Sequence, residues 1–158
     1  MLRSILESIP IFSSLGDTDL NALSNYAYTQ IVPKGTTVVR QGDPGDALYV
    51  ILSGRVKVYT LDHEGTAVTL RYMQAGDYFG ELSVLDCEQR SASVETLETC
   101  NLAIIPSGEF GKILNKSPAM AIQLSLELSR RLRLCTQTLH QLHSRHEAGL
   151  NPGNDGTP

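Results

Sequence analysis

Residues 79–94 read FGELSVLDCEQRSASV, and this stretch contains the groups that a small phosphorylated ligand requires. Gly80 lacks a Cβ atom, so neighbouring backbone amides can approach an anion closely. Residues 82–85 can form one helical turn whose free N–H groups face a phosphate. Arg90 offers a planar, permanently charged guanidinium to the same phosphate. Glu81 is an acceptor and is expected to bind a neutral donor such as a ribose hydroxyl. The stretch therefore indicates a sugar-phosphate site rather than a catalytic centre.

Short strands are predicted on both sides of this stretch. From about residue 30 to residue 105, apolar runs are short or alternate with polar residues, as is typical of strands. Turn-forming residues separate them at positions 33–35, 42–45, 53–54, 63–65 and 75–77. Several short strands at this regular spacing predict an antiparallel sandwich or barrel.

Helices are predicted before and after the strands. Apolar spacing of the helical kind covers residues 2–9 and 17–28, and Pro10 breaks the chain between them. Ser107 is expected to cap a short helix that runs to about Lys116. A longer helix is expected over residues 117–143, with Pro118 in its first turn.

The last helix carries an apolar seam. Its members are spaced four, three, four and three residues apart, which is the repeat of a coiled coil over two heptads. They are Leu128, Leu132, Cys135, Leu139 and Leu142. The seam predicts either a homodimer or a helix face that packs on its own barrel. Residues 144–158 are polar and are expected to form a disordered tail, so the domain is predicted to span residues 1–143.

Several runs along the chain together resemble the cyclic nucleotide-binding domain family, which includes protein kinase A regulatory subunits, cyclic-nucleotide-gated channels and bacterial catabolite activator proteins. The runs are IVPKG at 31–35, QGDPGD at 41–46, LYVILSGRV at 48–56 and GDYFGE at 76–81, followed by the stretch described above. The resemblance covers about residues 5–143. It implies a mainly β, α+β fold: an antiparallel β-roll, or jelly-roll barrel, flanked by N-terminal helices and a long C-terminal helix.

The resemblance also implies roles for single residues. Arg90 matches the arginine that binds the cyclic phosphate, and Glu81 matches the glutamate that binds the ribose 2′-hydroxyl. A hydroxyl at Ser91 can contact the phosphate or a guanine amino group, so both cAMP and cGMP are candidate ligands. Gln89 departs from the family, in which many members have proline before the arginine. The complete set of implied ligand-binding residues is Phe79, Gly80, Glu81, Leu82, Ser83, Arg90, Ser91 and Ala92.

The residues implied for the base pocket are Arg71, Met73 and Thr136. Arg71 and Met73 lie two apart in the strand before the ligand-binding stretch, and Met73 is equally typical of a core position. Thr136 matches one of two adjacent hydroxyl residues in catabolite activator proteins, and Cys135 replaces the other.

Composition excludes several other classes of function. The chain has 158 residues, 41% of them hydrophobic, and a net charge of −4, which argues against nucleic acid as its main partner. Arg130, Arg131 and Arg133 lack interleaved aromatic residues, so no direct DNA binding is expected. No apolar run is long enough to span a bilayer, and a cytoplasmic protein without a membrane partner is expected. The 3 cysteines and 4 histidines form neither a disulfide framework nor a metal-binding pattern, and no metal or other cofactor is predicted.

No nucleophile is accompanied by a general base, so no enzyme is predicted. The sequence instead predicts a stand-alone sensor that binds cAMP or cGMP and signals to an unknown protein effector by moving its C-terminal helix. Two alternatives stay open: a dimeric interaction module of the same fold without nucleotide, and a sensor of another phosphorylated ligand such as cyclic di-GMP.

Overall fold

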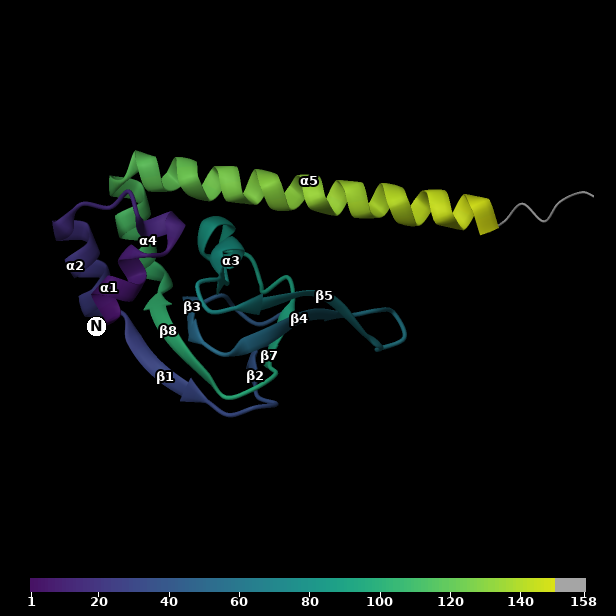
Figure 1. Ribbon diagram of the computed structural model, residues 1–158, viewed down its shortest axis with the longest axis horizontal. Coiled ribbons are helices and arrows are strands. Elements are labelled where there is room, and N and C mark those ends of the chain that lie inside the picture. Colours follow the sequence, from purple (N-terminus) through teal and green to yellow (C-terminus); the bar gives the residue numbers. More distant parts are fainter. Residues whose placement is uncertain (150–158) are drawn as a thin grey trace, which may run out of the picture. The chain divides into compact units, whose positions relative to one another are not determined.

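The computed structural model describes residues 1–149 and divides the chain into two units. The first unit, residues 1–121, contains three short helical segments, eight strands and two further helices, and its labels are those of Figure 1. The helical segments before the strands are α1 (Leu2–Glu7), the 3₁₀ turn η1 (Pro10–Phe12) and α2 (Asp17–Tyr26). The strands are β1 (Tyr28–Val32), β2 (Thr37–Val39), β3 (Ala47–Ser53), β4 (Arg55–Leu61), β5 (Ala67–Gln74), β6 (Tyr78–Phe79), β7 (Ser93–Thr96) and β8 (Cys100–Pro106). Helix α3 (Glu81–Asp86) lies between β6 and β7, and α4 (Ser107–Lys116) follows β8.

The strands form two antiparallel sheets of four strands each. Their orders are β1-β8-β3-β6 and β2-β7-β4-β5. The predicted β-roll with flanking helices is therefore confirmed, as two sheets rather than a closed barrel. Strand β3 is an inner strand of the first sheet, because it pairs with β8 on one side and with β6 on the other, where Tyr49 lies opposite Phe79.

A hydrophobic core joins the two sheets. Its buried members are Val32, Val39, Ile51, Val56, Val58, Met73, Phe79, Val94, Cys100 and Leu102. One buried polar side chain, Thr96, ties the turn before β2 to β7. Its hydroxyl donates to the carbonyl of Pro33 at 2.6 Å and accepts from the amide of Thr36 at 2.9 Å. Because both bonds are made, the hydroxyl is buried without an unpaired group.

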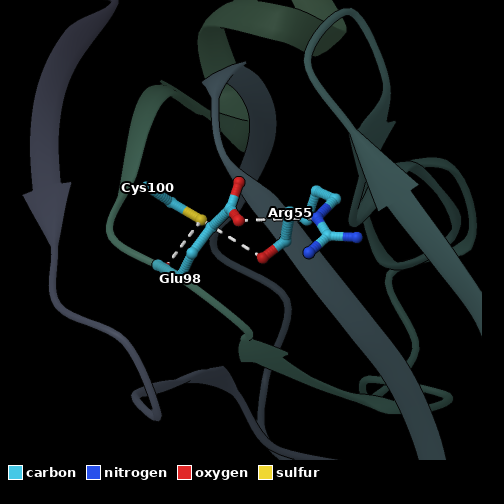
Figure 2. A network of polar contacts seen from close by, with 3 residues as sticks. All are labelled: Arg55, Glu98 and Cys100. Carbon is cyan, nitrogen blue, oxygen red and sulfur yellow. Dashed lines mark hydrogen bonds and ion pairs between the residues drawn. The ribbon is translucent and has the colours of Figure 1, made fainter.

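The thiol of Cys100 lies at the turn between β3 and β4 (Figure 2). Its Sγ is 3.4 Å from the carbonyl oxygen of Arg55 and 3.3 Å from that of Glu98, while the Arg55 and Glu98 side chains form an ion pair at 3.5 Å. Burial raises the pKa of the Cys100 thiol above its ordinary value. This cysteine is therefore a packing residue with a protonated side chain.

Helices α1, α2 and α4 differ in detail from the sequence prediction. Helix α1 ends at Glu7 and Pro10 starts a separate 3₁₀ turn, because proline lacks the amide that would continue the helix. Helix α2 ends at Tyr26, since β1 begins at Tyr28 and draws the chain into the sheet. Ser107 is the first residue of α4 and not its cap; Pro106 holds the cap position without a side-chain hydrogen bond.

Helix α5 (Pro118–Gly149) contains all described residues of the second unit, which begins at Ile122. At its start, Ser117 Oγ accepts a hydrogen bond from the Met120 amide at 3.2 Å. The helix continues six residues beyond the predicted end at residue 143, so the prediction of a tail from residue 144 is wrong for residues 144–149. No proline or glycine interrupts residues 144–148, and His143 pairs with Glu147 at 3.1 Å along the helix. The rest of the predicted tail, residues 150–158, lies outside the described residues.

Candidate functional site

The junction of β6 and α3 places the FGEL motif around a buried arginine. Gly80 caps α3 with φ of 91°, in the left-handed region that glycine adopts without strain. A Cβ atom at this position would overlap Nη1 of Arg90 and lie 2.9 Å from the carbonyl oxygen of Ala47. Only glycine therefore fits between the helix start and the arginine.

Arg90 is only 4% exposed, and its guanidinium is held on several sides. Nη1 donates to the carbonyl of Gly80 at 3.1 Å, and Nη2 donates to the carbonyl of Ala47 at 2.8 Å and to the carboxylate of Asp46 at 3.3 Å. The guanidinium carbon also lies 5.6 Å from the ring centre of Tyr49. A buried cation is costly without such partners, so these contacts offset the cost of its burial and fix its position.

The backbone of Arg90 is fixed as well. Its amide donates to the carbonyl of Asp43 at 2.8 Å, and its carbonyl accepts from the amide of Gly42 at 2.9 Å. An isolated bridge pairs Gln89 with Pro44. Two hydrogen bonds therefore hold the turn directly after Gln89, the position at which many family members have proline.

A pocket opens next to Arg90. Its lining residues come from β2, β4, β5, the β6–α3 junction and the segment before and within β7: Val39, Val58, Arg71, Phe79, Gly80, Glu81, Leu82, Ser83, Arg90, Ser91, Ala92 and Val94. All eight residues that the sequence analysis assigns to ligand binding lie along this one pocket. The fold thus brings together residues from both ends of the 79–94 stretch.

Glu81 is the first residue of α3 and is only 2% exposed. A carboxylate at the start of a helix is stabilised by the partial positive charge of the free N–H groups there. Ser83, two residues further along, is also buried. Helix α3 ends at Asp86, and the exposed Cys87 that caps it has φ of 58°. The pocket therefore contains a carboxylate and a guanidinium on short, fixed segments.

The three residues assigned to the base pocket differ in their surroundings. Arg71 lines the pocket beside Arg90. Met73 lies in the hydrophobic core, is 5% exposed and does not line the pocket. Thr136 belongs to the second unit, where its hydroxyl donates to the carbonyl of Leu132 at 3.0 Å within α5.

Sequence reasoning missed Asp46, Ala47 and Tyr49 as contacts of Arg90. These residues stand at the start of β3, more than forty positions before the arginine. They fall within or between runs that carry the family resemblance, but nothing in their local pattern points to residue 90. The pocket-lining valines, Val39, Val58 and Val94, were also missed, because alternating strand valines are typical of any core.

Two of the three clustered arginines of α5 form ion pairs within that helix. Arg130 and Arg131 both bind Glu127, at 2.8 and 3.2 Å. Within residues 1–149 no group of three or more histidine, cysteine or acidic side chains could hold a metal ion. In the same part of the chain no helix is both long enough and apolar enough to cross a membrane.

Comparison with known proteins gives a consistent result. The model of the cyclic nucleotide-binding domain family matches residues 29–117, more than half of the chain. The cyclic AMP receptor protein of Thermus thermophilus is 31% identical over 128 residues, which cover 81% of this chain and 59% of that protein. The chain therefore spans about three fifths of the length of that relative.

Solved structures agree. The crystal structure of the Thermus thermophilus catabolite activator protein superimposes with a TM-score of 0.75 at 31% identity, covering 85% of this chain and 63% of that one. The regulatory domain of Toxoplasma gondii protein kinase A, solved with cAMP, gives a TM-score of 0.67 at 30% identity, covering 71% of this chain and 42% of that one.

Proposed function

The chain belongs to the cyclic nucleotide-binding domain family, as its sequence predicts, and we propose that it is a non-catalytic sensor that binds cAMP or cGMP in the pocket beside Arg90. In this role Arg90 binds the cyclic phosphate, and the carboxylate of Glu81 accepts a hydrogen bond from a ribose hydroxyl. Gly80, Leu82 and Ser83 present backbone amides to the phosphate. Ser91 and Arg71 line the same pocket, and in this proposal they contact the phosphate or the base.

The observation that carries the proposal is the position of Arg90. Arg90 is 4% exposed and lines the pocket, and the three hydrogen bonds of its guanidinium hold it close to the position from which it can receive an anion. The buried carboxylate of Glu81 lines the same pocket and disfavours a second anionic group there. One phosphate and one neutral hydroxyl are the pair of ligand groups that this arrangement accepts.

We further propose that α5 transmits the signal, as part of a domain that begins at residue 1 and includes this helix. Leu132, Leu139 and Leu142 are each more than half exposed on one seam of α5, together with Leu128 and Cys135. A seam with this spacing fits a parallel or antiparallel coiled coil with a second copy of the chain. A ligand can shift such an equilibrium only by binding one helix arrangement more tightly than the other. An unidentified protein effector would read the change.

Isothermal titration calorimetry with cAMP, cGMP and cyclic di-GMP tests the proposal. The purified protein is first unfolded and its supernatant checked for co-purified nucleotide, which would mask the site. Arg90→Ala is the test variant. Arg55→Ala is the matched control, because Arg55 is an exposed arginine whose ion pair with Glu98 lies outside the pocket.

Removing one partner of a buried, hydrogen-bonded charge pair costs about 2–5 kcal/mol. We therefore expect the dissociation constant for cAMP or cGMP to rise by at least about 30-fold in Arg90→Ala and to stay unchanged in Arg55→Ala. If the protein binds cyclic di-GMP and neither cAMP nor cGMP, the ligand assignment changes to cyclic di-GMP. No heat from any nucleotide, with folded and empty protein, would leave the dimeric interaction module as the function.

A further inference from the structure

The aromatic ring of Tyr49 contacts both the pocket arginine and Phe79, at the end of β6. The guanidinium carbon of Arg90 is 5.6 Å from the ring centre. The ring of Phe79 stacks on the same tyrosine, with ring centres 5.0 Å apart and planes at 2°. Tyr49 and Phe79 face each other because they are opposite partners in the β3–β6 pair.

The Tyr49 ring helps to stabilise the positive charge of Arg90, which its hydrogen-bonded partners stabilise only in part. The carboxylate that pairs with Arg90 belongs to Asp46, whose side chain is 81% exposed and so largely screened by water. Two further partners of the guanidinium are the carbonyl dipoles of Gly80 and Ala47. The negative face of an aromatic ring attracts a cation most strongly where water is excluded, and the Arg90 side chain is 3% exposed.

The ring also limits where the guanidinium can go. The two carbonyls and Asp46 hold the terminal nitrogens in the plane of the group. Such in-plane bonds leave a planar group free to tilt toward either face, and the Tyr49 ring lies close enough to restrict that tilt. Its own position is set by the stack on Phe79, a residue of the pocket wall.

We propose that Tyr49 is the positioning residue of the nucleotide site: its ring face holds the Arg90 guanidinium in the orientation that receives the phosphate, so that the electron density of the ring sets the affinity. The inference rests on the proposed function and assigns a part of it to a residue outside the FGEL motif. The hydroxyl of Tyr49 is not required for this role, because it is the ring face that lies against the cation.

The test varies the ring at position 49 while its shape stays nearly constant. Tyr49→Phe removes the hydroxyl, and phenylalanine analogues with one to four ring fluorines are then placed at position 49 by non-natural amino-acid incorporation. Fluorine withdraws electron density from the ring face, which weakens attraction to a cation with little change in packing. Titration with cAMP and cGMP and the thermal midpoint are measured for each protein. Tyr72→Phe serves as control, because Tyr72 is 68% exposed on β5 and does not line the pocket.

We expect Tyr49→Phe and Tyr72→Phe to bind as the unsubstituted protein does. The dissociation constant should rise stepwise with each fluorine, to about tenfold in total, at a nearly constant thermal midpoint. Tyr49→Leu, which lacks the ring, should show the same loss or a larger one. A purely structural role of Tyr49 predicts a changed midpoint but no graded dependence on fluorine.

Two negative results have different meanings. If the unsubstituted protein and the fluorinated series bind equally well, the positioning role of Tyr49 is wrong and the sensor function stands. If the unsubstituted protein binds no cyclic nucleotide, the proposed function fails and the positioning role fails with it.

Discussion

Gly80 has both a positive φ and no room for a Cβ atom, and the substitution Gly80→Ala tests the two together. Gly76→Ala is the matched control, because it tests the positive φ alone. Gly80 and Gly76 have nearly the same φ, 91° and 93°, in the left-handed region. An alanine costs about 1–2 kcal/mol in this backbone conformation at either position. A Cβ atom at Gly76 meets no other atom within 4 Å, whereas at Gly80 it overlaps Nη1 of Arg90 and lies 2.9 Å from the Ala47 carbonyl.

The structure therefore predicts unequal losses of stability. Gly76→Ala should lower the free energy of unfolding by about 1–2 kcal/mol, which is the backbone cost alone. Gly80→Ala should lower it by about 2–5 kcal/mol, since overpacking a well-filled site adds about 1–3 kcal/mol. Urea unfolding followed by circular dichroism measures both values.

Binding should separate the two variants further. The methyl group that Gly80→Ala introduces would displace the guanidinium and break its bond to the carbonyl of residue 80, so we expect at least about a tenfold loss of cyclic-nucleotide affinity. Gly76→Ala should bind as the unsubstituted protein does. Equal stability of the two variants, or full nucleotide affinity in Gly80→Ala, would refute the assignment of Gly80 as the residue that makes room for Arg90.

Three further predictions concern other parts of the chain. Thr96→Val keeps the shape of the side chain but leaves the Thr36 amide without its partner, so unfolding free energy should fall by about 1–3 kcal/mol in urea titrations. A thiol reagent such as dithionitrobenzoate should label the exposed Cys87 at once and Cys100 only on unfolding, and an equal labelling rate for both would contradict the burial of Cys100. Because folding raises the pKa of the Cys100 thiol, the stability that its protonated form contributes should be lost as pH rises through the folded-state pKa. Leu132→Ser with Leu139→Ser should convert a dimer to a monomer in sedimentation analysis, and an unchanged mass would exclude the seam as the interface.

The strands and the FGEL motif were predictable because their signals are local. Alternating side chains and turn residues at short spacing specify strands within a window of a few residues. Gly80 and Arg90 lie ten positions apart in the 79–94 stretch, so their contact needs only one short helix between them. The two-residue repeat of a strand places Arg71 and Met73 on the same face. It does not predict that Arg71 lines the pocket whereas Met73 lies in the hydrophobic core.

The contacts of Arg90 with β3 were not predictable, for a physical reason. They depend on the register of β3 against β6 and β8, and a shift of one residue would turn Tyr49 away from the arginine. Local sequence does not state which strands become neighbours. The extent of α5 was misjudged for a different reason: the coiled-coil seam ends near residue 143, but residues 144–148 contain no proline or glycine, and the helix continues through them to Gly149, the last described residue.

The hydrogen bonds around Asp46 connect the pocket to the helical part of the first unit. Its carboxylate accepts from Nη2 of Arg90 at 3.3 Å, and its carbonyl accepts from the amide of Ser107 at 2.9 Å, at the first residue of α4. A phosphate that draws the guanidinium toward itself competes with the exposed carboxylate for the same cation, and any displacement of Asp46 acts directly on the start of α4. The hydrogen bonds that link Arg90, Asp46 and Ser107 do not by themselves transmit a signal. The ligand changes α4 only if the Asp46–Ser107 contact differs in free energy between the free and bound states. Of the three hydrogen bonds that the guanidinium donates, the bond to Asp46 is the longest, and its acceptor is largely exposed to water. It is therefore the contact that an incoming phosphate replaces at the lowest cost, and the first place where binding can alter the fold.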